Sequence, residues 1–454
     1  MQPSEESVIA RTPTTQGLSA YQWFAVAVAC AAWLFDNVGQ RLFSLGRIPA
    51  LASLLHAPGS DLAVQSAAKW ATAYFLLGWG VGGLILGVLG DRFGRAKLLT
   101  ISVLLYSLCT GATALSRTAW DFSVLRFATG VGIGGVFGLA VALISETVPD
   151  RARLAALSWL QILSTVGNVG AALISFGVDA VAQARGVPVS QSWRWLFWAG
   201  AAPAALALLW APWLRESELW LRKRRDARSA GGIAQLLAQL VNGQQARRNL
   251  LIGCLLCIAG VVGLWGIGEY AVDLQDAVFT RFYAAAGPLA AHKVATAKNL
   301  AYVLQMSGGA LGMVLFARAA DRYGRRPAFI AGFSAALITT VLTYWLLNSP
   351  VEAYWMMPVM GAGQLSVFAG FSIYLPELFA TRCRSTGVSV AYNLGRFAAA
   401  AGSLLSAGLA SGVFGRFAEP LPLRYSAMSM CVVFLLGVTA ALFAPETKGK
   451  PLPD

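Results

Sequence analysis

The chain has 454 residues, of which 57% are hydrophobic and 12% are charged, and its mean hydropathy is +0.61. Because an average soluble domain is about 25% charged, this composition excludes an ordinary soluble fold and favours a protein with many membrane-spanning helices. The formal net charge of +14 does not indicate a nucleic-acid partner, since the charges lie in short loops between apolar stretches.

Twelve apolar stretches follow one another along the chain. Each has about 20 residues or more, enough to cross a hydrocarbon core of about 30 Å. An even number of spans puts both termini on one side. Lys and Arg lie mainly in the segments on that side, so we expect it to be the cytoplasm. The predicted spans are 21–46, 67–90, 98–116, 120–146, 154–178, 193–213, 249–272, 298–318, 327–347, 351–378, 385–412 and 424–444.

These spans predict an all-α, polytopic protein of the inner or plasma membrane with two pseudo-symmetric halves of six helices. We place the halves at 20–214 and 249–444, joined by a cytoplasmic linker at 215–248. Cytoplasmic tails are expected at 1–19 and 445–454. The protein is expected to be a monomer in the lipid bilayer.

A short charged loop occurs twice and indicates two homologous halves, the plan of many secondary transporters. Its copies are Gly90-Asp91-Arg92-Phe93-Gly94-Arg95 and Ala320-Asp321-Arg322-Tyr323-Gly324-Arg325-Arg326. Each is followed, at nearly the same offset, by a Glu and an Arg. We predict that ion pairs among these groups close a cytoplasmic gate, although one surface pair contributes only ~0–1 kcal/mol. The predicted gate residues are Asp91, Arg92, Arg95, Glu146, Arg153, Asp321, Arg322, Arg325, Glu377 and Arg384.

Two charges are predicted deep inside the first half, where burying a charge is costly and usually functional. At about 1.5 Å per residue, Asp36 and Arg126 lie at similar depth, about 21–22 Å from the cytoplasmic side. An ion pair would lower the cost of burying both. A carboxylate beside an Arg changes partner when it takes up a proton, so we predict that this pair couples transport to protons. A purely structural salt bridge is the alternative.

A second set of polar residues is predicted near the middle of the membrane, where transporters built from repeats bind their substrates. Arg396 offers a bidentate fork for a carboxylate or a phosphate, or pairs with a protein carboxylate. Gln161 and Asn168 lie two turns apart on one helix face. They bind a ligand or link helices. Asn393, one turn before Arg396, completes the predicted set, and Arg41 is interpreted as reaching the outer boundary of the membrane.

Glycine-rich segments occur inside the predicted second and fourth spans. Gly130-Val131-Gly132-Ile133-Gly134-Gly135 matches a dinucleotide-binding pattern, but no strand precedes it. With Gly78, Gly82 and Gly83 it predicts close helix packing instead. No cofactor and no metal site are predicted.

Several motifs resemble those of the major facilitator superfamily, most closely its sugar-porter and organic-acid symporter branches. Gly87-x-x-x-Asp91-Arg92-x-Gly94-Arg95 resembles the motif between helices two and three, and the loop at Asp321 resembles its second copy. Arg126-x-x-x-Gly130 followed by Glu146 is similar to the fourth helix. Glu216-Ser217 with Trp220-Leu221, and Pro445-Glu446-Thr447-Lys448-Gly449, resemble two sugar-porter motifs.

The resemblance implies the roles of several residues. Asp36 and Arg126 stand where proton-coupled sugar porters carry their coupling pair, and Arg153, Gln161 and Asn168 keep the spacing of helix five. Leu255–Ala271 lacks the Gln and Asn of sugar porters, whereas Arg396 resembles the organic-anion symporters. The Asp-Gly-x-Asp pattern of aromatic-acid symporters is absent, since the chain reads Asp36-Asn37-Val38-Gly39-Gln40.

We therefore predict a secondary active transporter, not an enzyme, that moves a small polar solute by alternating access. Proton-coupled symport of an organic anion with a carboxylate is the favoured function. A sugar:proton symporter and a drug/proton antiporter are the alternatives within transport. A nutrient sensor that does not transport is the alternative from a different class.

Overall fold

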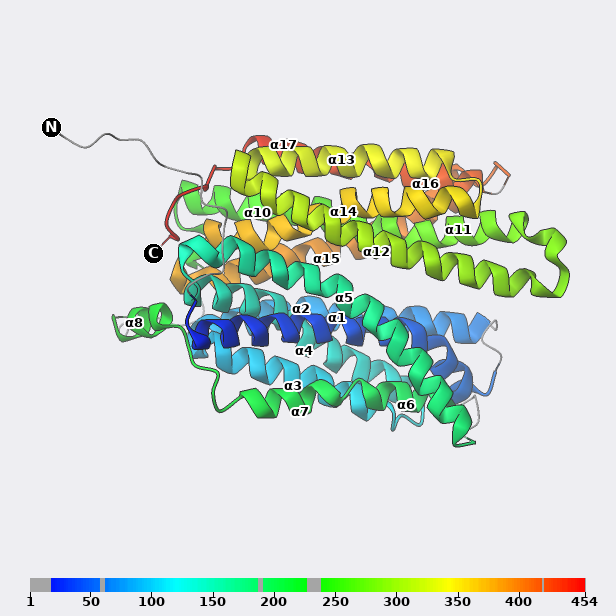
Figure 1. Ribbon diagram of the computed structural model, residues 1–454, viewed down its shortest axis with the longest axis horizontal. Coiled ribbons are helices and arrows are strands. Elements are labelled where there is room, and N and C mark those ends of the chain that lie inside the picture. Colours follow the sequence, from blue (N-terminus) through cyan, green and yellow to red (C-terminus); the bar gives the residue numbers. More distant parts are fainter. Residues whose placement is uncertain (1–17, 58–61, 187–190, 227–237, 419, 454) are drawn as a thin grey trace.

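Within the residues that the computed structural model describes (18–57, 62–186, 191–226, 238–418 and 420–453), the regular elements are all helices, as predicted. The first part of the chain ends with a short helix at the end of the bundle, α8 (Figure 1). In chain order its helices are α1 (Ala20–Leu55), α2 (Leu62–Phe93), α3 (Arg95–Thr113), α4 (Ala119–Thr147), α5 (Asp150–Ala184), α6 (Ser192–Ala199), α7 (Ala202–Trp210) and α8 (Glu218–Asp226).

The second part repeats this arrangement with a π-helical segment, η2, inside its first span. Such π-segments often occur at functional sites. The helices are α10 (Gln244–Val261), η2 (Val262–Gly268), α11 (Glu269–Phe282), η3 (Ala284–Leu289), α12 (Ala290–Tyr323), α13 (Arg325–Leu346), α14 (Pro350–Leu378), η4 (Thr381–Cys383), α15 (Arg384–Gly408), η5 (Leu409–Val413), α16 (Leu421–Met430) and α17 (Val432–Leu442).

Nine segments of the described chain are long and apolar enough to cross a membrane. Three more predicted spans correspond to α1, to α6 with α7, and to α15. The helices α6 and α7 are each shorter than a span, because the helix is interrupted at Gly200 between them. Several helices are longer than the spans predicted within them: α1 continues to Leu55, past 46, and α12 begins at Ala290, before 298.

The two groups of helices pack in the same way. In the first half, α2 and α3 pack on α4 and α1 packs on α5. In the second, α12 and α13 pack on α14 and α10 packs on α15. Between the halves, α2 contacts α15 and α5 contacts α12, so these four helices enclose the space between them. Figure 1 shows α1–α7 below and α10–α17 above.

Glycines let the paired helices approach closely, as the sequence predicts. A Cβ atom on Gly134 of α4 would lie 2.2 Å from the carbonyl oxygen of Trp79 on α2. The second half has the same contact, because a Cβ on Gly308 of α12 would lie 2.0 Å from the carbonyl oxygen of Pro358 on α14. Small residues at these crossings therefore set the helix separation.

The start of α1, helix α8 and the C-terminal segment lie at the same end of the bundle (Figure 1). We call this end the terminal face. Both charged loops lie here, at Gly94 between α2 and α3 and at Gly324 between α12 and α13. Each of these glycines has a positive φ, 113° and 101°, which favours Gly over residues with a side chain.

Candidate functional site

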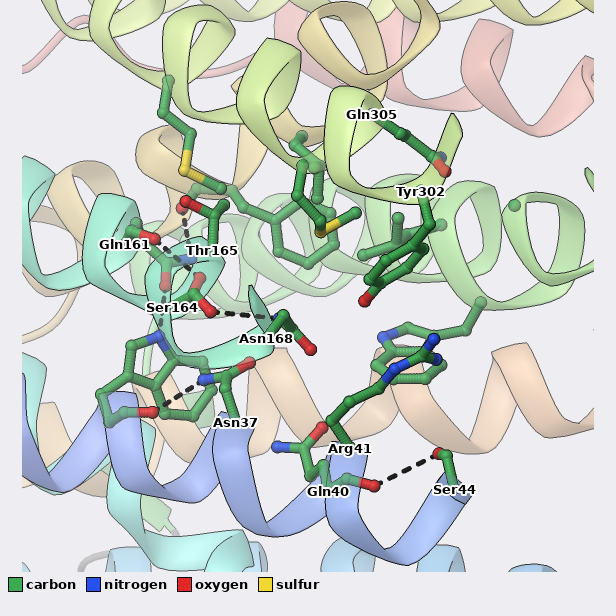
Figure 2. A pocket seen from close by; sticks show the side chains of 18 of the residues that line it. Asn37, Gln40, Arg41, Ser44, Gln161, Ser164, Thr165, Asn168, Tyr302 and Gln305 are labelled. Atoms are coloured by element: carbon green, nitrogen blue, oxygen red, sulfur yellow. Dashed lines mark hydrogen bonds between the residues drawn. The ribbon is translucent and has the colours of Figure 1, made fainter. Parts of the chain in front are cut away.

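A cavity lies between the two halves, with residues of α1, α2, α5, η2, α12, α14 and α15 in its walls. Its empty volume is about 1020 Å³, including the part that opens outward, which suits a small molecule. Figure 2 shows side chains of α1, α5 and α12 directed into it. The polar lining residues are Asn37, Gln40, Arg41, Ser44, Gln161, Ser164, Thr165, Asn168, Gln305 and Arg396, and the aromatic ones are Trp33, Trp79, Trp265, Tyr302, Phe368 and Tyr392.

The charge of the cavity is positive. Arg41 and Arg396 contribute guanidinium groups, and the described lining residues include neither Asp nor Glu. Six aromatic rings provide flat apolar walls. The cavity is therefore suited to an anion with a planar or apolar body.

Arg396 is buried and held in one position. Its guanidinium carbon lies 3.4 Å from the ring centroid of Trp79 and 4.5 Å from that of Tyr392. Its Nη1 donates to Oδ1 of Asn393 at 3.0 Å. Asn393 is itself anchored, because its Nδ2 donates to the Ser389 carbonyl. Asn393 does not line the cavity, so the prediction of direct substrate contact is corrected: it positions Arg396.

The two amides of α5 differ in their surroundings. Gln161 accepts a hydrogen bond from the Trp33 indole at 2.6 Å and donates to the Phe368 carbonyl at 2.9 Å, so it links α5 to α1 and α14. Among the described residues, Asn168 donates to the Ser164 carbonyl of its own helix, and Figure 2 shows it directed into the cavity. Asn168 is thus the amide of this pair with free capacity to bind a ligand.

Asp36 and Arg126 are both completely buried, but they do not form the predicted ion pair. No contact of 4.0 Å or less between charged atoms joins them in the described chain. Arg126 instead donates to the Thr113 hydroxyl and the Cys109 carbonyl and stacks on Phe197. Asp36 accepts from the Gln40 amide at 3.0 Å, and its Oδ2 has no hydrogen-bond partner. The similar depth predicted for the two charges did not make them a pair, because each binds different neighbours.

Gln40 connects the buried carboxylate to the cavity, and sequence reasoning missed it. It lines the cavity and donates to Asp36, whose charge also interacts with that of Arg396 across the halves. The position of Arg41 is corrected as well. Since α1 continues to Leu55, Arg41 lies inside the helix and faces the cavity (Figure 2). The spacing of Asn37, Gln40 and Arg41 on one helix face was the available signal.

The terminal face holds a second cluster of charges, which joins the halves. Arg95 lies 2.8 Å from Asp91 and 3.2 Å from Glu146, and Arg384 of the second half lies 3.1 Å from the same Glu146 oxygen. All four side chains are fully buried. The Asp91 carboxylate also accepts from the amide and hydroxyl of Thr386, at 2.7 and 2.6 Å. The described conformation is thus closed at the terminal face.

The second copy of the loop does not repeat this cluster. Arg325 pairs with Glu377 at 2.8 Å within its own half, while Arg384 crosses to the first half. Arg153, a predicted gate residue, does not join the cluster, because it binds Asp150 and the Ser145 carbonyl. Asp321 forms no ion pair in the described chain. Arg92 and Arg322 are exposed and lie over the neighbouring rings of Phe93 and Tyr323.

Two glutamates cap the helices that follow the charged loops, a symmetry that sequence reasoning missed. Glu216 accepts from the Ala96 and Lys97 amides at the start of α3. Glu446 accepts from the Arg325 and Arg326 amides at the start of α13. Partial burial opposes ionisation of Glu446, but these and two further amides hold the pKa of its carboxyl below the ordinary value. The two glutamates are separated by the same offset as the loops, which was the signal available.

The family follows from a comparison of the whole chain with known families. A model described as "Sugar (and other) transporter" matches residues 56–250 and 281–454. The chain belongs to this family. This family is part of the major facilitator superfamily. The protein is therefore a membrane transporter of small molecules and not an enzyme.

Relatives of this transporter include proteins named for organic acids. One named "Probable 4-methylmuconolactone transporter" from Cupriavidus pinatubonensis is 26% identical over 93% of this chain and 90% of its own. The "Cis,cis-muconate transport protein" of Acinetobacter baylyi is 27% identical over 84% and 85%. A structure of the proton:xylose symporter XylE with 6-bromo-6-deoxy-D-glucose bound superposes with a TM-score of 0.74. It is 22% identical and covers 95% of this chain and 98% of its own, which establishes the shared fold.

Proposed function

We propose that this transporter moves an organic anion bearing a carboxylate together with protons, by alternating access. The observation that carries the proposal is the positive, aromatic-walled cavity between the halves. Arg396, fixed by Trp79, Tyr392 and Asn393, offers its remaining donors to the carboxylate. Asn168 supplies an amide from the other half. The organic-acid names of the two relatives support the same substrate class.

Asp36 is the proposed proton site, and Arg126 is the buried cation of the same half. When Asp36 takes up a proton, Arg396 loses a nearby negative charge, and a substrate carboxylate replaces it. Gln40 links the protonation of Asp36 to the cavity, since it binds Asp36 and faces the cavity. Proton and anion thereby favour each other's binding, which is the basis of symport.

The cluster of Asp91, Arg95, Glu146 and Arg384 is the proposed gate at the terminal face. Its cross-half bonds hold the conformation described here and break when the halves separate at this end. Arg325 with Glu377 keeps the second half rigid. We place the terminal face in the cytoplasm, the protein in the inner or plasma membrane, and the functional unit as a monomer.

A ligand screen on purified protein tests the substrate class. Thermal unfolding is measured with 4-methylbenzoate and with xylose, in the wild type, Arg396→Ala and the exposed control Arg416→Gln. We expect 4-methylbenzoate to stabilise the wild type and the control but not Arg396→Ala. Stabilisation by xylose that is insensitive to Arg396 would instead indicate a sugar porter.

A further inference from the structure

Arg41 is a second cation in the cavity, separate from Arg396 in the fold. It belongs to α1 in the first half, whereas Arg396 belongs to α15 in the second. Its guanidinium carbon lies 4.2 Å from the ring centroid of Tyr302 on α12, and Figure 2 shows the two side chains close together. Its Nε is buried without a hydrogen-bond partner. A ring stabilises a cation, but its face does not accept a strong hydrogen bond as a carboxylate does.

A substrate with a single carboxylate would leave the site with a net positive charge. Arg41 and Arg396 line the cavity, and Asp36 lies behind Gln40. With Asp36 protonated, the two guanidiniums carry two positive charges. A monoanion neutralises one of them and leaves the other without a counter-charge, since the described lining residues include neither Asp nor Glu. A dianion neutralises both, and a buried charge is tolerated when it is paired.

The geometry points to a dicarboxylate as the preferred substrate, with one carboxylate on Arg396 and the other on Arg41. This inference rests on the proposed function, because it assigns Arg41 as the residue that distinguishes dianions from monoanions in the same cavity. A ligand held at both ends connects α1 of the first half to α15 of the second. Its binding therefore links the two halves whose relative motion transports it.

Two ligands of the same shape separate the contribution of Arg41. Terephthalate and 4-methylbenzoate are both para-substituted benzenes, and they differ by one carboxylate in place of a methyl group. Their dissociation constants are measured by titration calorimetry on the purified full chain, with Arg41→Gln, Arg41→Lys and the exposed control Arg416→Gln. Unfolding temperatures without ligand establish that each variant is folded.

We expect the wild type to bind terephthalate at least about tenfold more tightly than 4-methylbenzoate, as one charged hydrogen-bonded contact implies. Arg41→Gln should remove this preference by weakening the binding of terephthalate much more than that of 4-methylbenzoate. Arg41→Lys should keep part of it, and Arg416→Gln should keep all of it. If Arg41→Gln is unfolded, Arg41→Lys takes its place, since Lys keeps the charge of Arg but not its two-pronged hydrogen bonding. A reduced preference for terephthalate in Arg41→Lys then supports the assignment, and an unchanged preference contradicts it.

Equal binding of the two ligands by the wild type, or an equal loss of both in Arg41→Gln, would overturn the assignment of Arg41. The proposed function would survive that result, provided that 4-methylbenzoate still requires Arg396. Failure of both anions to bind, with binding of xylose, would reject the proposed function itself.

Discussion

Replacing Glu146 by Gln should open the terminal face. Glu146 Oε1 is the atom that Arg95 and Arg384 share, at 3.2 and 3.1 Å, and the side chains are fully buried. The amide is almost the same size as the carboxylate but carries no charge. Arg95 keeps its pair with Asp91 in its own half, at 2.8 Å. The charged contact that is lost between the halves is therefore the one with Arg384.

The size of the effect follows from that single contact. A hydrogen bond between charged groups contributes about 2 kcal/mol, and about 1.4 kcal/mol corresponds to a factor of ten. Because the contact exists only when the terminal face is closed, its loss should raise the ratio of open to closed molecules roughly thirtyfold. The first half should also lose some stability, because its buried Arg95–Glu146 contact loses a charge.

Spin labels on cysteines at Arg92 and Arg322 report the opening, since both positions are exposed on the loops of opposite halves. Cys109, the half-buried native cysteine, is replaced by Ala in the background. Glu377→Gln is the matched control, because its partner Arg325 lies in the same half at 2.8 Å. A distance distribution in Glu146→Gln that equals the wild type, or an equal shift in Glu377→Gln, would refute the reasoning.

Three further predictions concern the proton site, the helix crossings and a helix cap. Asp36→Asn should abolish accumulation of 4-methylbenzoate driven by a pH gradient in proteoliposomes and leave counterflow exchange intact; undiminished accumulation would contradict the proton site. Gly134→Ala should lower stability by about 1–3 kcal/mol through overpacking against the Trp79 carbonyl, whereas Gly39→Ala, with nothing within 4 Å of its Cβ, should change the unfolding temperature little. Glu446→Gln should lower the unfolding temperature at pH 7. Because the folded pKa of Glu446 lies below the ordinary value of 4.5, its stabilisation is complete above that value and is lost as the pH falls through the folded pKa. The difference in unfolding temperature between Glu446→Gln and the wild type should thus shrink by pH 3. A difference that does not change with pH would show that the negative charge of Glu446 does not stabilise the fold.

The sequence by itself determined the class of protein and its division into two related halves. Length and hydropathy give helices that cross a membrane, because an apolar stretch of sufficient length has no other stable arrangement in lipid. The repeated loop predicts related halves, and glycine spacing predicts close crossings such as that of Gly134 on α2. Arg396 was predicted from the sequence as a residue of the substrate site, and it does line the cavity.

Only the tertiary structure decided which groups meet. Asp36 and Arg126 were predicted at similar depth yet bind different partners, and Arg384 forms its ion pair with Glu146 of the other half. Rise per residue fixes the height of a side chain along a helix, but not the neighbour that the rotation of that helix presents to it. The direction of the Arg41 side chain was likewise decided by the tertiary structure, which turns it into the cavity. The sequence thus supplies the charges, and the packing of the two halves decides which of them face the cavity.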